Sequence, residues 1–213
     1  MYEKGKWLRR VQSGYPEKWK EYLAEKERLV VEYGLHKYFL WDDYFKPHQN
    51  FFLRWLWDTL PNRDTAILDA GCGIGFLALR LHNLGYNDYH GIDVNESSIA
   101  VGTKLLSKFG LDPNLRSGSV GETGFEEGQF NVVCALDASY DSGFDMERAC
   151  KEAHRVLKRR GYLVMDIAYT PSELYTKLYG KDEMEEYLSD FSSVEFLSIP
   201  KREDLKYGVV ARR

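Results

Sequence analysis

Two acidic residues flank a glycine-rich turn in the first half of the chain. Asp69 stands just before the run GCGIG at 71–75, and Asp93 follows about 20 residues after the first of these glycines. Glycines allow a tight turn and let a ligand approach the backbone closely, and a carboxylate can accept two hydrogen bonds from a vicinal diol. An acid before the turn suits a diphosphate poorly, and Phe76 occupies the position where the dinucleotide fingerprint needs glycine. The pattern therefore favours a nucleoside that carries a cationic, amine-bearing tail.

The turn and both acids fall where a buried strand ends or a helix begins. The apolar pattern predicts strands over 66–70, 88–94, 115–120, 130–136, 162–167, 194–199 and 207–211. It predicts helices over 76–84, 97–109, 146–157 and, with an interruption at Gly180, 172–191. Strands that alternate with helices indicate a mostly parallel sheet with helices on both faces. Such sheets bind ligands at the carboxyl ends of their strands.

The first 63 residues do not show the alternation of strands and helices that is predicted for the rest of the chain. Helical spacing is found over 17–33 and again over 51–60, and an aromatic cluster at 38–45 separates the two helices. The region is too small to bury a core of its own. We therefore expect residues 1–63 to form an N-terminal helical cap that belongs to the same domain as the ligand-binding residues 64–213.

Four segments, in the expected order, resemble motifs of the class I S-adenosylmethionine-dependent methyltransferases. The first two are ILDAGCGIGFLALRL and YHGIDVNESSI, and they are similar to the first and second motifs of that family. The others are FNVVCALDAS, similar to the fourth-strand motif, and EAHRVLKRRGYLVM, similar to the segment often written RVLKPGG. The resemblance implies an α/β, Rossmann-like class I methyltransferase fold with a mostly parallel seven-stranded sheet whose last strand is antiparallel. It also implies S-adenosylmethionine as the cofactor.

Carried over by position, the resemblance implies a set of cofactor-binding residues. Asp69 and the glycines of the turn would line the methionine end of the cofactor. Asp93 would take the ribose hydroxyls, and Val94 would pack against adenine. The full implied set is Asp69, Gly71, Cys72, Gly73, Asp93, Val94, Ser119, Val120 and Asp137.

Two positions depart from the family pattern. Ser119, which precedes Val120, stands where the family commonly has an acid near the adenine amine. Arg159 and Arg160 replace the usual Pro-Gly before the fifth strand. We expect only a local change in loop geometry from the second departure.

Methyl transfer requires the protein chiefly to align the nucleophile and to exclude water. Few residues of this chain are suited to act as a general base or to contact the methyl acceptor. Asp137 ends the fourth strand and is the first candidate, although it could equally orient the cofactor or cap a loop. Tyr140 lies in the following loop, where ordinary turn chemistry is the alternative. His48, like His36, lies in the cap, where a histidine could be a general base or a surface or core residue. The predicted catalytic set is Asp137, Tyr140 and His48.

The aromatic side chains of the cap permit two interpretations. They could form a lid that recognises a flat or cationic substrate by stacking. Alternatively, they attach the cap to the sheet, and this is the interpretation we favour for most of them. The rings expected to reach a pocket are Tyr33, Tyr38, Trp41 and Tyr44.

Charge, hydropathy and cysteine content indicate which partners and which cellular location can be expected. The chain has 29 Lys+Arg and 33 Asp+Glu, a net charge of −4, which disfavours a nucleic-acid binder. No apolar run is long enough for a membrane span, and the first residues lack the apolar stretch of a secretory signal. Three cysteines without CxxC spacing predict no metal site and favour a reducing cytoplasm.

These features together predict a cytoplasmic methyltransferase that acts on an oxygen or nitrogen nucleophile of a small molecule by direct in-line transfer. One alternative is a methyltransferase that acts on a protein or on RNA. Another is a non-catalytic module that retains the cofactor-binding fold. The sequence makes no prediction of the oligomeric state.

Overall fold

The computed structural model of the chain describes residues 16–35, 47–112, 114–138, 144–170, 177–199 and 206–213. Several residues singled out in the sequence lie outside these segments: His36, Tyr38, Trp41, Tyr44 and Tyr140. His48 lies in a described helix, but its side chain is outside what the structure describes.

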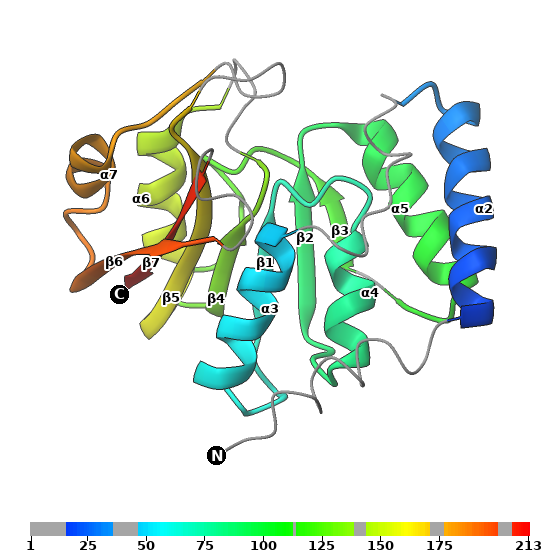
Figure 1. Cartoon of the computed structure of the whole chain (residues 1–213), viewed down its shortest axis with the longest axis horizontal. Helices are drawn as coiled ribbons and strands as arrows, with labels where there is room; N and C mark the ends of the chain where they lie inside the picture. The colour runs from blue at the N-terminus through cyan, green and yellow to red at the C-terminus, as the bar shows by residue number, and fades with distance from the viewer. Residues whose placement is uncertain (1–15, 36–46, 113, 139–143, 171–176, 200–205) are drawn as a thin grey trace.

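A seven-stranded sheet forms the centre of the molecule (Figure 1), in the order β3-β2-β1-β4-β5-β7-β6. Strand β7 is antiparallel to both of its neighbours, whereas β1 to β5 pair in parallel. The predicted fold class is therefore confirmed. The strands are β1 (Ile67–Ala70), β2 (Tyr89–Asp93), β3 (Asn114–Ser117), β4 (Phe130–Ala135), β5 (Leu157–Ala168), β6 (Ser193–Ser198) and β7 (Lys206–Arg212).

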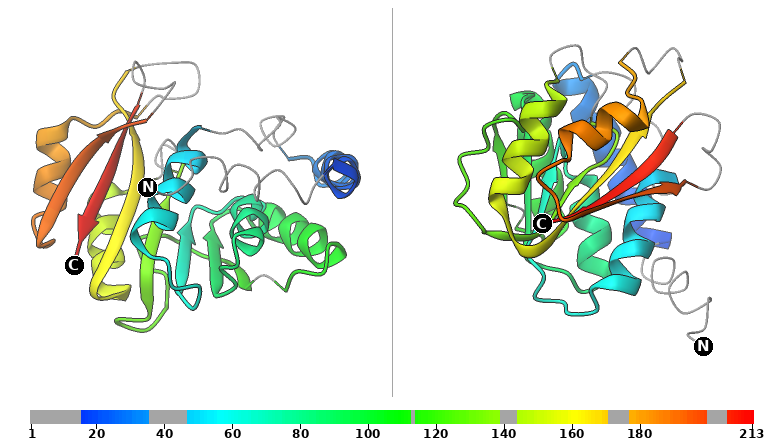
Figure 2. Two further views of the ribbon diagram at one scale, coloured as in Figure 1. Left: turned by 60° about the horizontal axis from the view of Figure 1, so that its bottom comes forward. Right: turned by 90° about the vertical axis from the view of Figure 1, so that its left-hand side faces the viewer.

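Helices cover both faces of this sheet, and Figure 2 shows them from two further directions. One face packs against α3 (Pro47–Thr59), α4 (Phe76–Asn83) and α5 (Glu96–Lys108). The other packs against α6 (Met146–Val156) and α7 (Lys181–Tyr187). Alternate residues of each buried strand point into the two cores, as Val164 and Met165 of β5 do.

The two helices that the structure describes in the N-terminal region, α2 (Pro16–Glu32) and α3, lie on the side of the sheet that also carries α4 and α5. Helix α3 lies close against β7, because an added Cβ at Gly208 would come 2.6 Å from Cζ of Phe51. Trp55 of the same helix meets Tyr162 of β5 edge-on, with ring centroids 5.3 Å apart. Helix α2 lies outside α5, where the ring of Tyr22 is buried. Aromatic rings of both helices therefore attach them to the rest of the domain.

The strand that contains Arg159 and Arg160 starts earlier than the sequence predicts. Strand β5 begins at Leu157, five residues before the expected start, and its pairing with β4 shifts register between Phe130 and Val132. Arg160 adopts a left-handed conformation, with φ of 66°, and its N–H donates to the carbonyl of Arg213. The change is therefore a local irregularity that the end of the chain stabilises.

Other boundaries differ from the sequence prediction as well, and helix α3 begins at Pro47, four residues before the expected start. Strand β3 ends at Ser117, before the expected residue 120. In the expected helical segment 172–191, the described residues hold only the short helix α7. None of these differences changes the order of the strands.

Candidate functional site

The glycine-rich turn between β1 and α4 has the left-handed backbone that only glycine adopts without strain. The φ angles of Gly71, Gly73 and Gly75 are 85°, 54° and 70°. The N–H of Gly71 donates to the carbonyl of Ile92 at the end of β2, at 2.8 Å. An added Cβ at Gly71 would lie 2.4 Å from Cβ of Ala138. The turn therefore passes very close to the end of β4.

Asp93 is bound to the rim of this turn. One carboxylate oxygen accepts from the N–H of Gly73 at 2.8 Å, and the other accepts from the N–H of Asn95 at 2.9 Å. Each oxygen has a further lone pair, so the carboxylate can accept additional hydrogen bonds. Val94, the next residue, is 67% exposed. Asp93 and Val94 thus present an acceptor and an apolar surface at the carboxyl end of β2.

Asp69, in contrast, is buried beneath the turn. Its side chain accepts a hydrogen bond from the Tyr89 hydroxyl at 2.8 Å and a weaker one from the thiol of Cys134 at 3.7 Å. Burial raises the pKa of Asp69 to about 7, and the nearby charge of Asp93 adds to this, although the two hydrogen bonds oppose it. The thiol of Cys72 is buried as well. The hydrogen bonds of the Asp69 side chain therefore join β1 to its two neighbours, β2 and β4.

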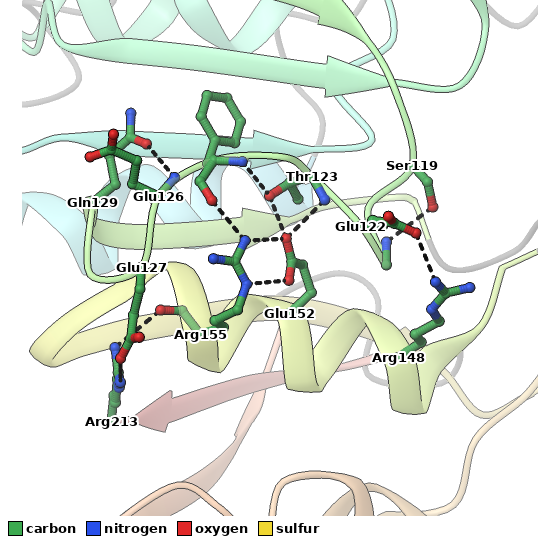
Figure 3. Close-up of polar contacts among 12 residues, drawn as sticks. Ser119, Glu122, Thr123, Glu126, Glu127, Gln129, Arg148, Glu152, Arg155 and Arg213 are labelled. Carbon is green, nitrogen blue, oxygen red and sulfur yellow. Dashed lines mark hydrogen bonds and ion pairs between the residues drawn. The ribbon is translucent and has the colours of Figure 1, made fainter.

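The loop that follows β3, which carries Ser119 and Val120, is anchored to α6 (Figure 3). The backbone N–H and the hydroxyl of Thr123 donate to one oxygen of Glu152, at 2.8 and 2.6 Å. Arg155 donates to the other oxygen at 2.7 Å and, through this hydrogen bond, holds the pKa of Glu152 down at about 2. This anchor fixes the path of the loop against α6.

A buried ionic cluster at the ends of β4, β5 and β7 was not predicted. The ammonium of Lys206 lies 2.6 Å from a carboxylate oxygen of Asp137 and 2.8 Å from one of Asp166. The side chains of Lys206 and Asp166 are 1% and 0% exposed, and that of Asp137 is 12% exposed. A sequence signal was present, since Asp166 is a single acid within the apolar run LVMDIA.

The cluster also determines the backbone at the end of β4. The N–H of Asp137 donates to the second carboxylate oxygen of Asp166 at 2.6 Å. Asp137 itself has φ of 58°, a left-handed conformation that costs a residue other than glycine free energy. The following residue is Ala138, whose Cβ limits the space at Gly71. The ionic cluster is therefore linked to the glycine turn through two consecutive residues.

Comparisons with known proteins match parts of the chain to methyltransferases. A family model described as a methyltransferase domain matches residues 68–165. The ribosomal protein L11 methyltransferase of Neisseria meningitidis is 31% identical over 83 residues, which cover 39% of this chain and 26% of that protein. The match therefore spans about a quarter of the relative's length.

Solved structures share the fold. A geranyl diphosphate methyltransferase in complex with S-adenosylmethionine is 17% identical with a TM-score of 0.63, over 77% of this chain and 83% of that one. The [4+2]-cyclase SpnF is 16% identical with a TM-score of 0.65, over 78% of this chain and 80% of that one. At these identities the likeness concerns the fold alone.

Two kinds of feature are absent from the described segments. No group of three or more His, Cys, Asp or Glu side chains in them is arranged to hold a metal ion. None of the helices in the same segments is long and apolar enough to cross a membrane.

Replacing Gly71 by alanine should distort the turn. The variant Gly71→Ala combines an unfavourable φ of 85° with a contact of 2.4 Å to Ala138, so we expect it to lose about 2–4 kcal/mol of stability. Gly110→Ala is the matched control, since Gly110 has φ of 77° but no atom within 4 Å of the added Cβ. Urea unfolding of both variants measures the difference. Equal losses would show that the close approach at Gly71 is absent.

The raised pKa of Asp69 should make stability depend on pH. The folded state binds more protons than the unfolded state between the ordinary value of 3.8 and about 7. The free energy of unfolding should therefore fall as pH rises through this window, by up to about 1.4 kcal/mol per pH unit, and then level off. Asp69→Asn keeps an acceptor for Tyr89 but cannot titrate, so it should lose this component. Parallel pH profiles for the two proteins would contradict the assignment.

Removing the ammonium of Lys206 should be costly because it leaves buried carboxylates uncompensated. We expect Lys206→Met to lose about 3 kcal/mol or more in urea unfolding. Lys151→Met is the control, because Lys151 is exposed and pairs with Glu147 on the surface; its loss should stay below about 1 kcal/mol. Adding Asp166→Asn to Lys206→Met should recover part of the loss. A double variant less stable than Lys206→Met would contradict this explanation.

Proposed function

Because the chain belongs to the class I S-adenosylmethionine-dependent methyltransferase family and S-adenosylmethionine is its cofactor, we propose that it methylates a small molecule. The methyl group would move to an oxygen or nitrogen nucleophile by direct in-line transfer. The observation that carries this proposal is the carboxylate of Asp93, fixed by two backbone N–H groups at the rim of the glycine turn.

The residues present fit this cofactor. Asp93 lies beside the left-handed glycine turn and keeps lone pairs for the hydroxyls of the ribose. Val94 is exposed beside Asp93, where it can pack against adenine, and Ser119 and Val120 belong to the anchored loop nearby. When bound, S-adenosylmethionine supplies a methyl group activated by a sulfonium centre. The protein therefore has only to place the acceptor.

Asp137 is the side chain that we propose for orienting the acceptor. The ammonium of Lys206 at 2.6 Å favours the charged carboxylate. A carboxylate is an acceptor only, so Asp137 is suited to accept a hydrogen bond from the O–H or N–H of the nucleophile. Tyr140 and His48 complete the proposed catalytic set.

The same proposal includes the role of the N-terminal region and the cellular location. We propose that residues 1–63 cap the acceptor site as part of the same domain. A cytoplasmic location is supported by the three cysteines, Cys72, Cys134 and Cys150, which are free and buried.

A second candidate is methylation of a protein. It is favoured by the name of the Neisseria relative, a ribosomal protein L11 methyltransferase. However, the match covers 26% of that protein, so its substrate is weak support here. A protein substrate would predict transfer of labelled methyl groups to macromolecules in an extract, whereas a small-molecule enzyme labels only the low-molecular-weight fraction.

Removing the carboxylate of Asp93 should weaken cofactor binding. We expect Asp93→Ala to bind S-adenosylhomocysteine at least about tenfold more weakly, which corresponds to about 1.4 kcal/mol. Asp88→Ala is the matched control, since Asp88 is a half-exposed acid that pairs with His90 at 3.1 Å at the start of the same strand. Calorimetric titration measures both affinities, and circular dichroism checks the fold. Unchanged affinity in Asp93→Ala would show that the ribose lies elsewhere.

A further inference from the structure

The loop that follows β3 begins beside Asp93. The register partner of Asp93 is Ser117 of β3, and the N–H of Gly118 donates to the carbonyl of Asp93 at 3.0 Å. The chain passes so close to β2 here that an added Cβ at Gly118 would lie 2.8 Å from Cδ1 of Ile92. The carboxylate of Asp93 meanwhile accepts from the N–H of Gly73 in the glycine turn. Asp93 therefore lies between the glycine turn and the start of this loop.

The order of the strands indicates which end of the cofactor meets the loop. The strands lie in the order β3-β2-β1-β4, and the carboxyl ends of parallel strands share one edge of the sheet. With the ribose on Asp93 of β2 and the sulfur at the end of β4, the methionine part of the cofactor crosses β1. The base then leaves the ribose in the opposite direction, over the loop after β3.

The hydroxyl of Ser119 is the first side-chain group of this loop that can form a hydrogen bond with a base. Ser119 is exposed, and its hydroxyl oxygen accepts from the N–H of Gly121 at 3.2 Å. A hydroxyl carries one donor and two lone pairs. None of the described residues accepts a hydrogen bond from this hydroxyl. The donor and one lone pair are therefore available to a ligand.

The first acid after Ser119 in the chain is directed elsewhere. A carboxylate oxygen of Glu122 lies 2.9 Å from the guanidinium of Arg148, and Figure 3 shows this side chain directed towards α6. The backbone of Glu122 also forms a bridge with Ser119, and Thr123 is held by Glu152 of α6. The anchored loop therefore carries a hydroxyl, and not a carboxylate, at position 119.

A hydroxyl and a carboxylate distinguish purines to different degrees. Adenine presents an amino donor at C6 beside an acceptor at N1, whereas a 6-oxopurine presents a carbonyl acceptor beside an N–H donor. A carboxylate can only accept, so it pairs with the amino group and is opposed by the carbonyl. A hydroxyl can donate or accept, so it can form a hydrogen bond with either base.

We propose that Ser119 determines the purine specificity of this chain, and that its hydroxyl gives similar affinity for the 6-amino and 6-oxo forms of the cofactor. The ligand class is therefore a purine nucleoside thioether with either group at C6. The inference rests on the proposed function, because it concerns the base of the cofactor whose ribose is assigned to Asp93.

The test compares S-adenosylhomocysteine with its 6-oxo analogue, S-inosylhomocysteine, by calorimetric titration into the full chain. We expect the two dissociation constants to agree within about threefold. Ser119→Asp introduces a carboxylate that can still accept from the N–H of Gly121. This variant should bind the 6-oxo analogue at least about tenfold more weakly than S-adenosylhomocysteine.

Ser107→Asp is the matched control, because Ser107 is exposed in the last turn of α5, at the opposite end of that helix from β2. It should keep the wild-type ratio of the two affinities, and urea unfolding checks that both variants are folded. A wild-type preference for S-adenosylhomocysteine above about threefold, an unchanged ratio in Ser119→Asp, or an equal change in Ser107→Asp would each overturn the inference. A wild-type chain that binds neither ligand would contradict the proposed function as well, whereas one that binds only S-adenosylhomocysteine would contradict this inference alone.

Discussion

The ammonium of Lys206 is the interaction on which the arrangement of the site depends. A lysine with 1% exposure requires acceptors within hydrogen-bond distance, and it finds them in Asp137 and Asp166. This requirement places the start of the antiparallel strand β7 against the ends of β4 and β5. Asp166 in turn binds the N–H of Asp137 while that residue holds a left-handed backbone. The next residue, Ala138, lies against the glycine turn. The buried ammonium of Lys206 therefore links the proposed acceptor side of the site to the proposed cofactor side.

Asp93 and Asp69 lie near the same glycine turn but differ in burial and in hydrogen-bond partners. Asp93 is half-buried and receives two backbone N–H groups, which leaves its carboxylate oriented at the rim. Asp69 is 4% exposed, and burial brings its pKa to about 7. The resemblance to known methyltransferases implies a cofactor role for both acids, and in the structure one lies half-buried at the rim while the other is buried.

The sequence predicted the sheet well, because buried strands such as β4 are marked by continuous apolar residues and the glycine turn by its spacing. The early start of β5 was missed because Lys158, Arg159 and Arg160 are exposed and show no strand pattern. The pairing of Lys206 with Asp166 was also missed, since it joins residues 40 positions apart. Contacts of that kind depend on the register of β5 with β7, which local patterns do not specify.

We propose that Asp93 and the glycine turn hold the ribose of S-adenosylmethionine. A crystal structure with S-adenosylhomocysteine tests this most directly. The account predicts that both ribose hydroxyls lie within hydrogen-bond distance, about 2.7–3.2 Å, of the Asp93 carboxylate. It also predicts that the sulfur faces the end of β4 at Asp137. A ribose bound away from Asp93, or a sulfur directed away from the end of β4, would contradict the account.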